Sequence, residues 1–320
     1  MSDFTIKGAL PILKASVSEF TANNALSLAA ALAFNAIFSI PPLLIIIIRA
    51  AGFFYGQEAV SGRLADQIST AVGSGAAEGI QSIIENAQVS GSGGLALWIG
   101  IGTLIFASTT FFATLQQSLN TVWNLKVKPT NNILYLIRER VFSFGIILSI
   151  ALLLLVSFVI SAAISILSGY LNKLLPDVGV WVIKLVDFIV SVGLITVLFG
   201  LIFKYLPDAI IRWKDTLIGA GVTALLFTIG KFLISWYIGT SDPGSAYGAA
   251  GSIIIILIWI YYSSMIVLFG AEFTQQYANR FGQHVRPKRH AVFVEEREVR
   301  KERHDVESGR PPAEGRFNKE

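Results

Sequence analysis

A few polar side chains lie within segments that are otherwise apolar enough to cross a membrane, and their chemistry is that of binding and passage. The first such segment, 27–52, reads SLAAALAFNAIFSIPPLLIIIIRAAG and contains Asn35, Pro41 and Pro42. Proline has no backbone N–H, so the pair leaves carbonyl groups one turn earlier without intrahelical partners. In hydrocarbon these carbonyls must be satisfied by neighbouring helices, by side chains or by water in a protein-lined cavity. The segment therefore predicts a broken helix that forms the wall of a central cavity.

Charged side chains form a second group of candidates. Lys231 lies well inside a later apolar segment, where Thr228 and Ser235 share its helix face. A charge within a membrane segment is costly enough to suggest function. A lysine about two turns from a helix end can also extend its ammonium group to water, which would give Lys231 no function. Lys184 and Asp187, three positions apart near the end of another apolar segment, are expected to pair with each other.

The last apolar segment carries hydroxyl groups near its midpoint, at Tyr261, Tyr262 and Ser264, and is closed by Glu272. Tyrosine normally favours the membrane interfaces, so hydroxyls at mid-depth are expected to face the interior of a helix bundle. There they either line a polar cavity together with Asn35 or bond to neighbouring backbone. Glu272 is either part of the same pathway or a solvated helix end.

Hydrolytic and ATP-driven chemistry finds no support in the sequence. The chain has no cysteine, and its histidines, His284, His290 and His304, are not at the spacings of a zinc motif. Neither a phosphate-binding loop of the G-x-x-x-x-G-K-[ST] type nor a G-x-S-x-G nucleophile elbow is present. We therefore expect no enzyme activity, no cofactor, no metal site and no ATPase within this chain.

The elements that position these residues are helices in a membrane. Of the 320 residues 53% are hydrophobic and 14% charged, against roughly 25% charged in a typical soluble domain. Basic residues concentrate between the second and third spans and between the fourth and fifth, so both termini are expected on the cytoplasmic side. The fold class is all-α, a polytopic membrane protein with six transmembrane helices, and length and hydropathy place them near 26–52, 94–115, 141–167, 181–203, 216–239 and 249–271.

Three regions follow from this pattern. Residues 1–25 form an amphipathic N-terminal helix, which either lies on the cytoplasmic membrane surface or packs as a cap on the bundle. Residues 26–282 form the six-helix transmembrane domain, with further amphipathic helices expected in the first outer loop, 53–93. The mixed charges of residues 283–320 are typical of a disordered cytoplasmic tail.

One of the six helices is expected to extend beyond the lipid. In TLQQSLNTVWN, which follows the second apolar span, Leu115, Leu119 and Val122 still share a helix face. The second transmembrane helix should therefore project into the cytoplasm.

Several stretches together resemble the YihY/BrkB family of bacterial membrane proteins. They are ALAFNAIFSIPPLL (31–44), TLQQSLNTVWN (114–124), YLPD with the RW and D that follow it (205–215), and YGAAGSIIIILIWIYYSSMIVLFGAEF (247–273). The resemblance implies a six-helix protein of the bacterial cytoplasmic (inner) membrane with both ends inside. The family was formerly labelled ribonuclease BN, and some members are suspected of moving lipids or lipid-linked precursors. The pair Pro41 and Pro42 departs from the single proline of the family pattern.

The leading hypothesis is a membrane transporter or flippase-like protein without its own ATPase. Its cavity would be lined by Asn35, Pro41 and Pro42 and by polar faces of the last two spans. Its partners would be membrane lipids and an amphiphilic substrate, with no nucleic acid. A non-transporting scaffold for envelope enzymes is the alternative, and the ribonuclease hypothesis has the least support.

Overall fold

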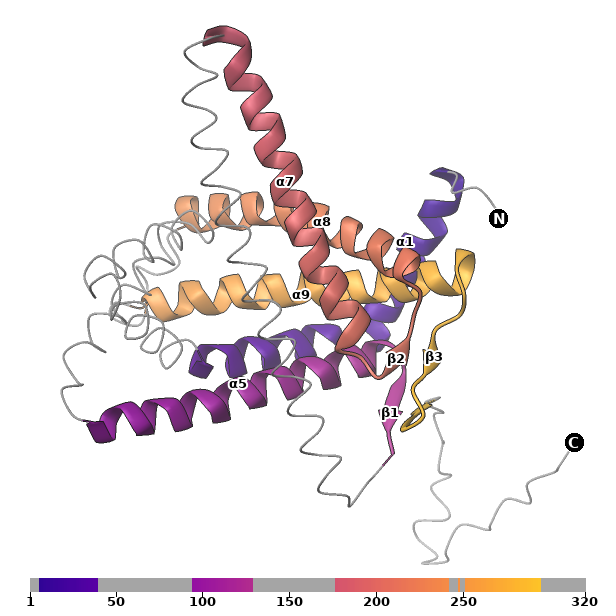
Figure 1. Cartoon of the computed structure of the whole chain (residues 1–320), viewed down its shortest axis with the longest axis horizontal. Coiled ribbons are helices and arrows are strands. Elements are labelled where there is room, and N and C mark those ends of the chain that lie inside the picture. The colour runs from indigo at the N-terminus through magenta and orange to yellow at the C-terminus, as the bar shows by residue number, and fades with distance from the viewer. Residues whose placement is uncertain (1–5, 40–93, 129–175, 242–246, 248–250, 295–320) are drawn as a thin grey trace, which may run out of the picture.

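The computed structural model describes residues 6–39, 94–128, 176–241, 247 and 251–294, and within them the chain is mostly helical (Figure 1). The helices are α1 (Ile6–Ala22), the segment Ala25–Ser39 that follows it, α5 (Gly94–Val122), α7 (Pro176–Tyr205), α8 (Trp213–Ser241) and α9 (Gly251–Phe281). The strands are short: β1 (Leu125–Val127), β2 (Ala209–Ile210), β3 (Arg286–Pro287) and β4 (Ala291–Phe293).

Three of the described helices are long and apolar enough to cross a membrane, over Phe188–Tyr205, Trp213–Ser241 and Ile253–Phe281. Leu10–Ala22 and Ala25–Ser39 pass the same test only as a pair, bent by 66°. The mostly helical character expected from hydropathy is thus confirmed, with three candidate membrane spans in the described part of the chain, while the topology of six transmembrane helices stays a prediction. The expected span 141–167, the loop helices in 53–93 and the prolines at positions 41 and 42 lie outside the described residues.

The bend that the structure does describe comes at Asn23 and Asn24. The backbone N–H of Asn23 donates to the backbone carbonyl of Glu19, in the last hydrogen bond of α1. Asn24 then adopts a φ of 50°. Asparagine tolerates this left-handed conformation better than most residues. The carbonyl of Asn24 accepts the first hydrogen bond of the next helix, from Ser27. Local backbone geometry therefore sets this break, well before the proline pair.

Helix α1 packs on the bundle through one face and leaves another exposed. Ile12 is 1% exposed and joins Phe273 and Tyr277 of α9 in a small apolar cluster. Leu10 and Val17, two other apolar residues of α1, are instead 75% and 53% exposed. The helix therefore packs on the bundle through Ile12 while Leu10 and Val17 remain exposed.

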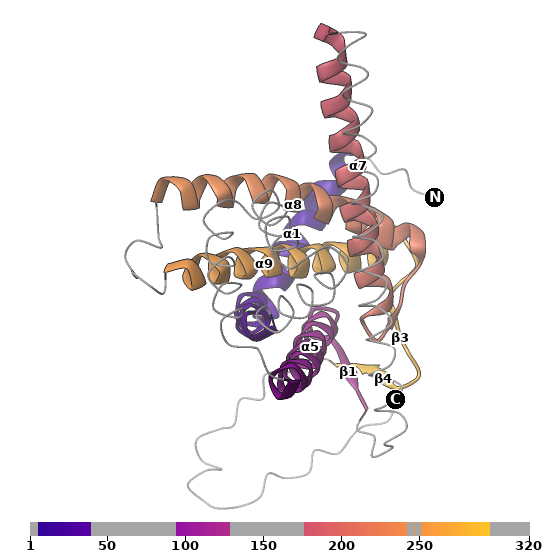
Figure 2. The same ribbon diagram turned by 60° about the vertical axis from the view of Figure 1, so that its left-hand side comes forward.

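Helices α8 and α9 lie side by side in both views (Figures 1 and 2) and approach closely through glycine. Gly219 of α8 packs against Thr274 of α9, and Gly270 of α9 packs against Thr223 of α8, so that a Cβ atom on either glycine would overlap the threonine. Each threonine hydroxyl donates to the carbonyl of the glycine four positions earlier on its own helix, over 2.7 and 2.6 Å. Small residues in such positions hold membrane helices together by close packing.

We use the term base for the end of the molecule at which α5, α7 and α9 end and α8 begins. Strand β1 pairs with β4 and β2 with β3, both antiparallel, so the segment after α9 is joined to the connections that follow α5 and α7. Helix α7 contributes its last turns to the base and projects away from the other helices toward its N-terminus (Figure 2).

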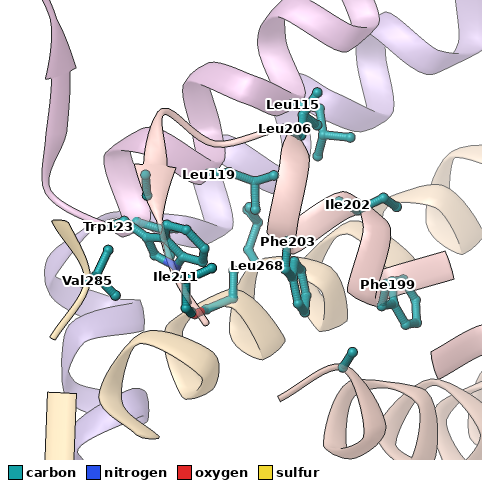
Figure 3. Close-up of a cluster of buried hydrophobic side chains, with 14 of the residues drawn as sticks. Leu115, Leu119, Trp123, Phe199, Ile202, Phe203, Leu206, Ile211, Leu268 and Val285 are labelled. Atoms are coloured by element: carbon teal, nitrogen blue, oxygen red, sulfur yellow. Dashed lines mark hydrogen bonds between the residues drawn. The ribbon is translucent and has the colours of Figure 1, made fainter. Parts of the chain in front are cut away.

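A cluster of apolar side chains fills the base (Figure 3). Trp123 is fully buried in this cluster, and its indole Nε1–H donates to the carbonyl of Ala271 over 2.9 Å. Leu119 and Phe203 approach from α5 and α7 and are also fully buried. Helix α5 continues through the expected extension and ends at Val122, while its projection into the cytoplasm stays a prediction.

The start of the expected tail belongs to this folded unit. Residues 283–294, which the charge pattern assigns to a disordered segment, contain β3 and β4 and place Val285 in the apolar core. Charge composition misleads here because the polar side chains of this segment bind a buried carboxylate on another element. A boundary at residue 283 therefore cuts through the base, and residues 295–320 lie outside the described part of the chain.

Candidate functional site

Glu272 of α9 is a fully buried carboxyl group at the base. Its Oε1 accepts a hydrogen bond from Nδ2 of Asn23 over 2.7 Å, and the same amide nitrogen lies 3.3 Å from the carbonyl oxygen of Val122. Its Oε2 is buried without a hydrogen-bond partner among the described residues. The carboxyl thus lies where the break after α1, the end of α5 and α9 meet.

No cation offsets the carboxyl group of Glu272 in the described part of the chain. Within the described ranges no lysine, arginine or histidine forms an ion pair with it. The carboxylate of Glu19, one turn before Asn23 on α1, acts on it electrostatically as a like charge. Burying a carboxylate without a cation is expensive, so this site requires a chemical explanation.

Asp208 forms a second buried carboxylate at the base, and both of its oxygens are satisfied. Its Oδ2 accepts from the amides of Gln116 and Asn120 over 3.1 and 2.8 Å, and Asn120 accepts in return from the backbone N–H of Asp208. Its Oδ1 lies 2.7 Å from Nε2 of His290 and 3.9 Å from Nζ of Lys288. This cluster therefore fastens α5 and the turn between β3 and β4 to the end of α7.

Asn35 contacts α5, farther from the base than Asn23. Its amide Nδ2 donates to Oγ1 of Thr114 on α5 over 2.9 Å, and the Thr114 hydroxyl in turn donates to the carbonyl of Thr110. Asn35 and Asn23 are twelve positions apart, which is ~18 Å along a helix. The two amides thus make separate polar contacts, Asn23 with α9 and Asn35 with α5, and the buried side chains between them, Ala25, Ala29 and Leu32, are apolar.

The remaining candidates on α9 lie elsewhere. Tyr262 packs its ring and hydroxyl against Gly230 of α8, Tyr261 is packed against the apolar core, and Ser264 is buried. No hydrogen bond among the described residues joins any of these three to Asn35. The expectation that they share one cavity stays a prediction.

The charged candidates within the membrane segments are placed only in part. Lys231 is half-buried on α8. Lys184 and Asp187 lie within α7, but their side chains are outside the described residues. Their pairing therefore also stays a prediction.

Sequence reasoning singled out Glu272 but missed Asn23 and the Asp208 cluster. Gln116 and Asn120 are four apart on α5 and so share a face, which is a signal for a common partner. Nothing in the local pattern indicates that this partner is Asp208. Among the described residues, no group of three or more His, Cys, Asp or Glu side chains is placed to hold a metal ion.

The apolar helices and their buried polar contacts define a polytopic membrane protein. The family described as "Virulence factor BrkB" matches residues 16–294 of the chain, which belongs to that family. This match covers all the residues that form the base and confirms the resemblance seen in the sequence.

Similar proteins carry the same broad description. A "UPF0761 membrane protein" of Psychromonas ingrahamii is 31% identical over 254 residues, covering 76% of this chain and 79% of that protein. One from Haemophilus influenzae is 26% identical and covers 79% of this chain and 90% of its own. One from Tolumonas auensis is 30% identical over 180 residues, covering 55% of this chain and 56% of that protein. No solved structure matches the chain.

Proposed function

We propose that this protein is a transporter or flippase-like protein of the bacterial inner membrane, without its own ATPase, that moves an amphiphile. The observation that carries the proposal is Glu272, a fully buried carboxyl with an oxygen that lacks a partner among the described residues, beside a break between two helices. Ionisable groups inside membrane proteins mark pathways and relays, and transporters place broken helices at their binding sites.

The contact between Asn35 and Thr114 supports the same function. An amide within a membrane segment costs free energy unless it is hydrogen-bonded, and here its donor is satisfied across two helices. The amides of Asn35 and Asn23 and the carboxyl of Glu272 would supply separate polar contacts for a headgroup, while acyl chains remain in lipid. The exposed apolar residues of α1, Leu10 and Val17, would keep that helix in contact with the membrane surface.

The experiment is a lipid scrambling assay in vesicles of phosphatidylethanolamine and phosphatidylglycerol containing the purified protein. Fluorescent phosphatidylglycerol reaching the outer leaflet is bleached by an impermeant reductant, and the rate of bleaching reports movement. We expect the protein to accelerate this movement and Asn35→Leu to slow it. A wild-type protein that leaves the rate equal to that of empty vesicles would contradict the proposal for lipid.

Thr114→Val and Thr110→Val form a matched pair for this assay. Both threonines donate their hydroxyls to the carbonyl four positions earlier, so both substitutions remove that bond. Only Thr114 also accepts from Asn35. Slower scrambling in Thr114→Val alone would connect transport to the amide contact, whereas equal slowing in both would indicate a general effect on α5.

A scaffold for envelope enzymes is the second candidate, and one observation favours it. Val292, Phe293 and Val294, at the end of the β1–β4 pair, are exposed apolar residues on the base. Cross-linking in cells would recover a stoichiometric partner whose binding is lost in Val292→Glu, while Asn35→Leu would have no effect. Deletions in this test should begin after Val294, because residues 283–294 complete the base.

A further inference from the structure

Glu272 differs from the other buried carboxyl groups in the described part of the chain. Asp208 and Asp215 each have a basic side chain at 3.9 Å, from Lys288 and Arg212 respectively. Glu272 has an amide at 2.7 Å and no cation among the described residues. A charge in such a place is far more costly than a neutral carboxylic acid, which costs only as much as other buried polar groups.

We propose that the carboxyl group of Glu272 is a proton-binding site that couples substrate movement to the transmembrane proton gradient. This inference rests on the proposed transport function. The proton occupies Oε2, the oxygen without a described partner, while Oε1 keeps its hydrogen bond from Asn23. No covalent bond other than the O–H bond forms or breaks.

The groups that face Glu272 do not compensate the negative charge that it acquires when it loses its proton. On α1 the facing groups are Glu19, a like charge, and the neutral amide of Asn23. On α5 it is a backbone carbonyl, at Val122. On α8 the buried carboxylate of Asp215 lies against Gly282, which follows the end of α9 and is ten positions from Glu272, or ~15 Å at the rise of a helix. Loss of the proton would therefore add an uncompensated negative charge beside Glu19.

The break after α1 lies where a charge on Glu272 would change the position of α1 relative to Ala25–Ser39. Asn23 holds Glu272 and immediately precedes Asn24, the residue with positive φ at the 66° bend. When Glu272 is charged, its repulsion from Glu19 and its need for water favour a different position of α1 against Ala25–Ser39. A proton would thus select between two arrangements of the break, which is the property that a coupled transporter needs.

Infrared spectroscopy of the whole protein in vesicles of phosphatidylethanolamine and phosphatidylglycerol tests proton binding without any transport substrate. We expect a carbonyl band of a protonated carboxylic acid that titrates with pH, is lost in Glu272→Gln and persists in Glu19→Gln. Glutamine keeps the shape and the acceptor for Asn23, so the variant should still fold. Absence of the band from the wild type, or its persistence in Glu272→Gln, would overturn the inference.

A second measurement separates this inference from the transport function itself. Scrambling of fluorescent phosphatidylglycerol is followed with and without an imposed pH gradient, and we expect the gradient-dependent part of the rate to be lost in Glu272→Gln. Scrambling that ignores the gradient, or follows sodium instead, would overturn proton coupling and leave transport intact. A titrating band without any scrambling would overturn lipid transport and leave the proton site intact.

Discussion

Thr223 of α8 lies directly against Gly270 of α9, so close that the glycine cannot accept a Cβ atom. The relationship recurs with the helices exchanged at Thr274 and Gly219. Two glycine–threonine contacts in antiparallel register fix the depth and the rotation of one helix against the other. The α8–α9 pair is therefore a rigid frame against which the polar contacts at the base are positioned.

The first prediction concerns this frame. Gly270→Ala should destabilise the protein by about 1–3 kcal/mol, because the added methyl group overlaps Thr223 in a packed interface. Adding Thr223→Ala should recover part of the loss. Gly193→Ala on α7, where no atom lies within 4 Å of the added methyl group, is the matched control and should be neutral or stabilising. Midpoints of thermal unfolding in detergent provide the comparison, and equal losses in both variants would refute the packing argument.

The second prediction concerns Asp208. Asp208→Asn should weaken the attachment of the β3–β4 turn by about 1.5–3 kcal/mol, because hydrogen bonds to a charged group are lost or weakened. Trypsin should then cleave faster at Lys288, which the wild type holds against the end of α7. Asp215→Asn alters another buried carboxylate of the base that does not contact this turn, and should leave the cleavage unchanged. Unaltered cleavage in Asp208→Asn would contradict the role of the cluster.

A third prediction measures the state of Glu272 through its hydrogen bond. In a double-mutant cycle of Asn23→Ala and Glu272→Ala, the coupling free energy should be about 1 kcal/mol for a neutral acid and about 1.5–3 kcal/mol for a carboxylate. We expect the smaller value near neutral pH, measured by unfolding in bicelles. The larger value would show that the carboxyl is charged there.

A fourth prediction concerns the bend. Asn24 has a φ of 50°, which glycine adopts freely and a β-branched residue does not. Asn24→Gly should leave the unfolding midpoint nearly unchanged, whereas Asn24→Val should cost about 1–2 kcal/mol or more. If both variants unfold at the wild-type midpoint, the bend does not depend on this backbone conformation.

The parts of the structure that could be predicted are those with a repeating pattern. Apolar runs predicted the helices, and the shared face of Leu115, Leu119 and Val122 predicted the extension of α5, because helical periodicity is a local property. The bond between Asn23 and Glu272 joins residues 249 positions apart, and that between Asp208 and His290 joins residues 82 apart. Contacts between residues so far apart leave no periodic pattern in the sequence. The sequence therefore indicated only that Glu272 closes a helix and that His290 belongs to a charged tail.

The partners of Asp208 also set an order of events during synthesis. Its amide ligands on α5 precede it in the chain, but Lys288 and His290 follow it by about eighty residues. Until the ribosome has passed His290, Asp208 lacks its cationic contacts and β1 and β2 lack their partner strands. The base therefore closes only after α9 has been made, so a nascent chain that stops short keeps an unpaired acid and two open strand edges that quality-control proteases can recognise.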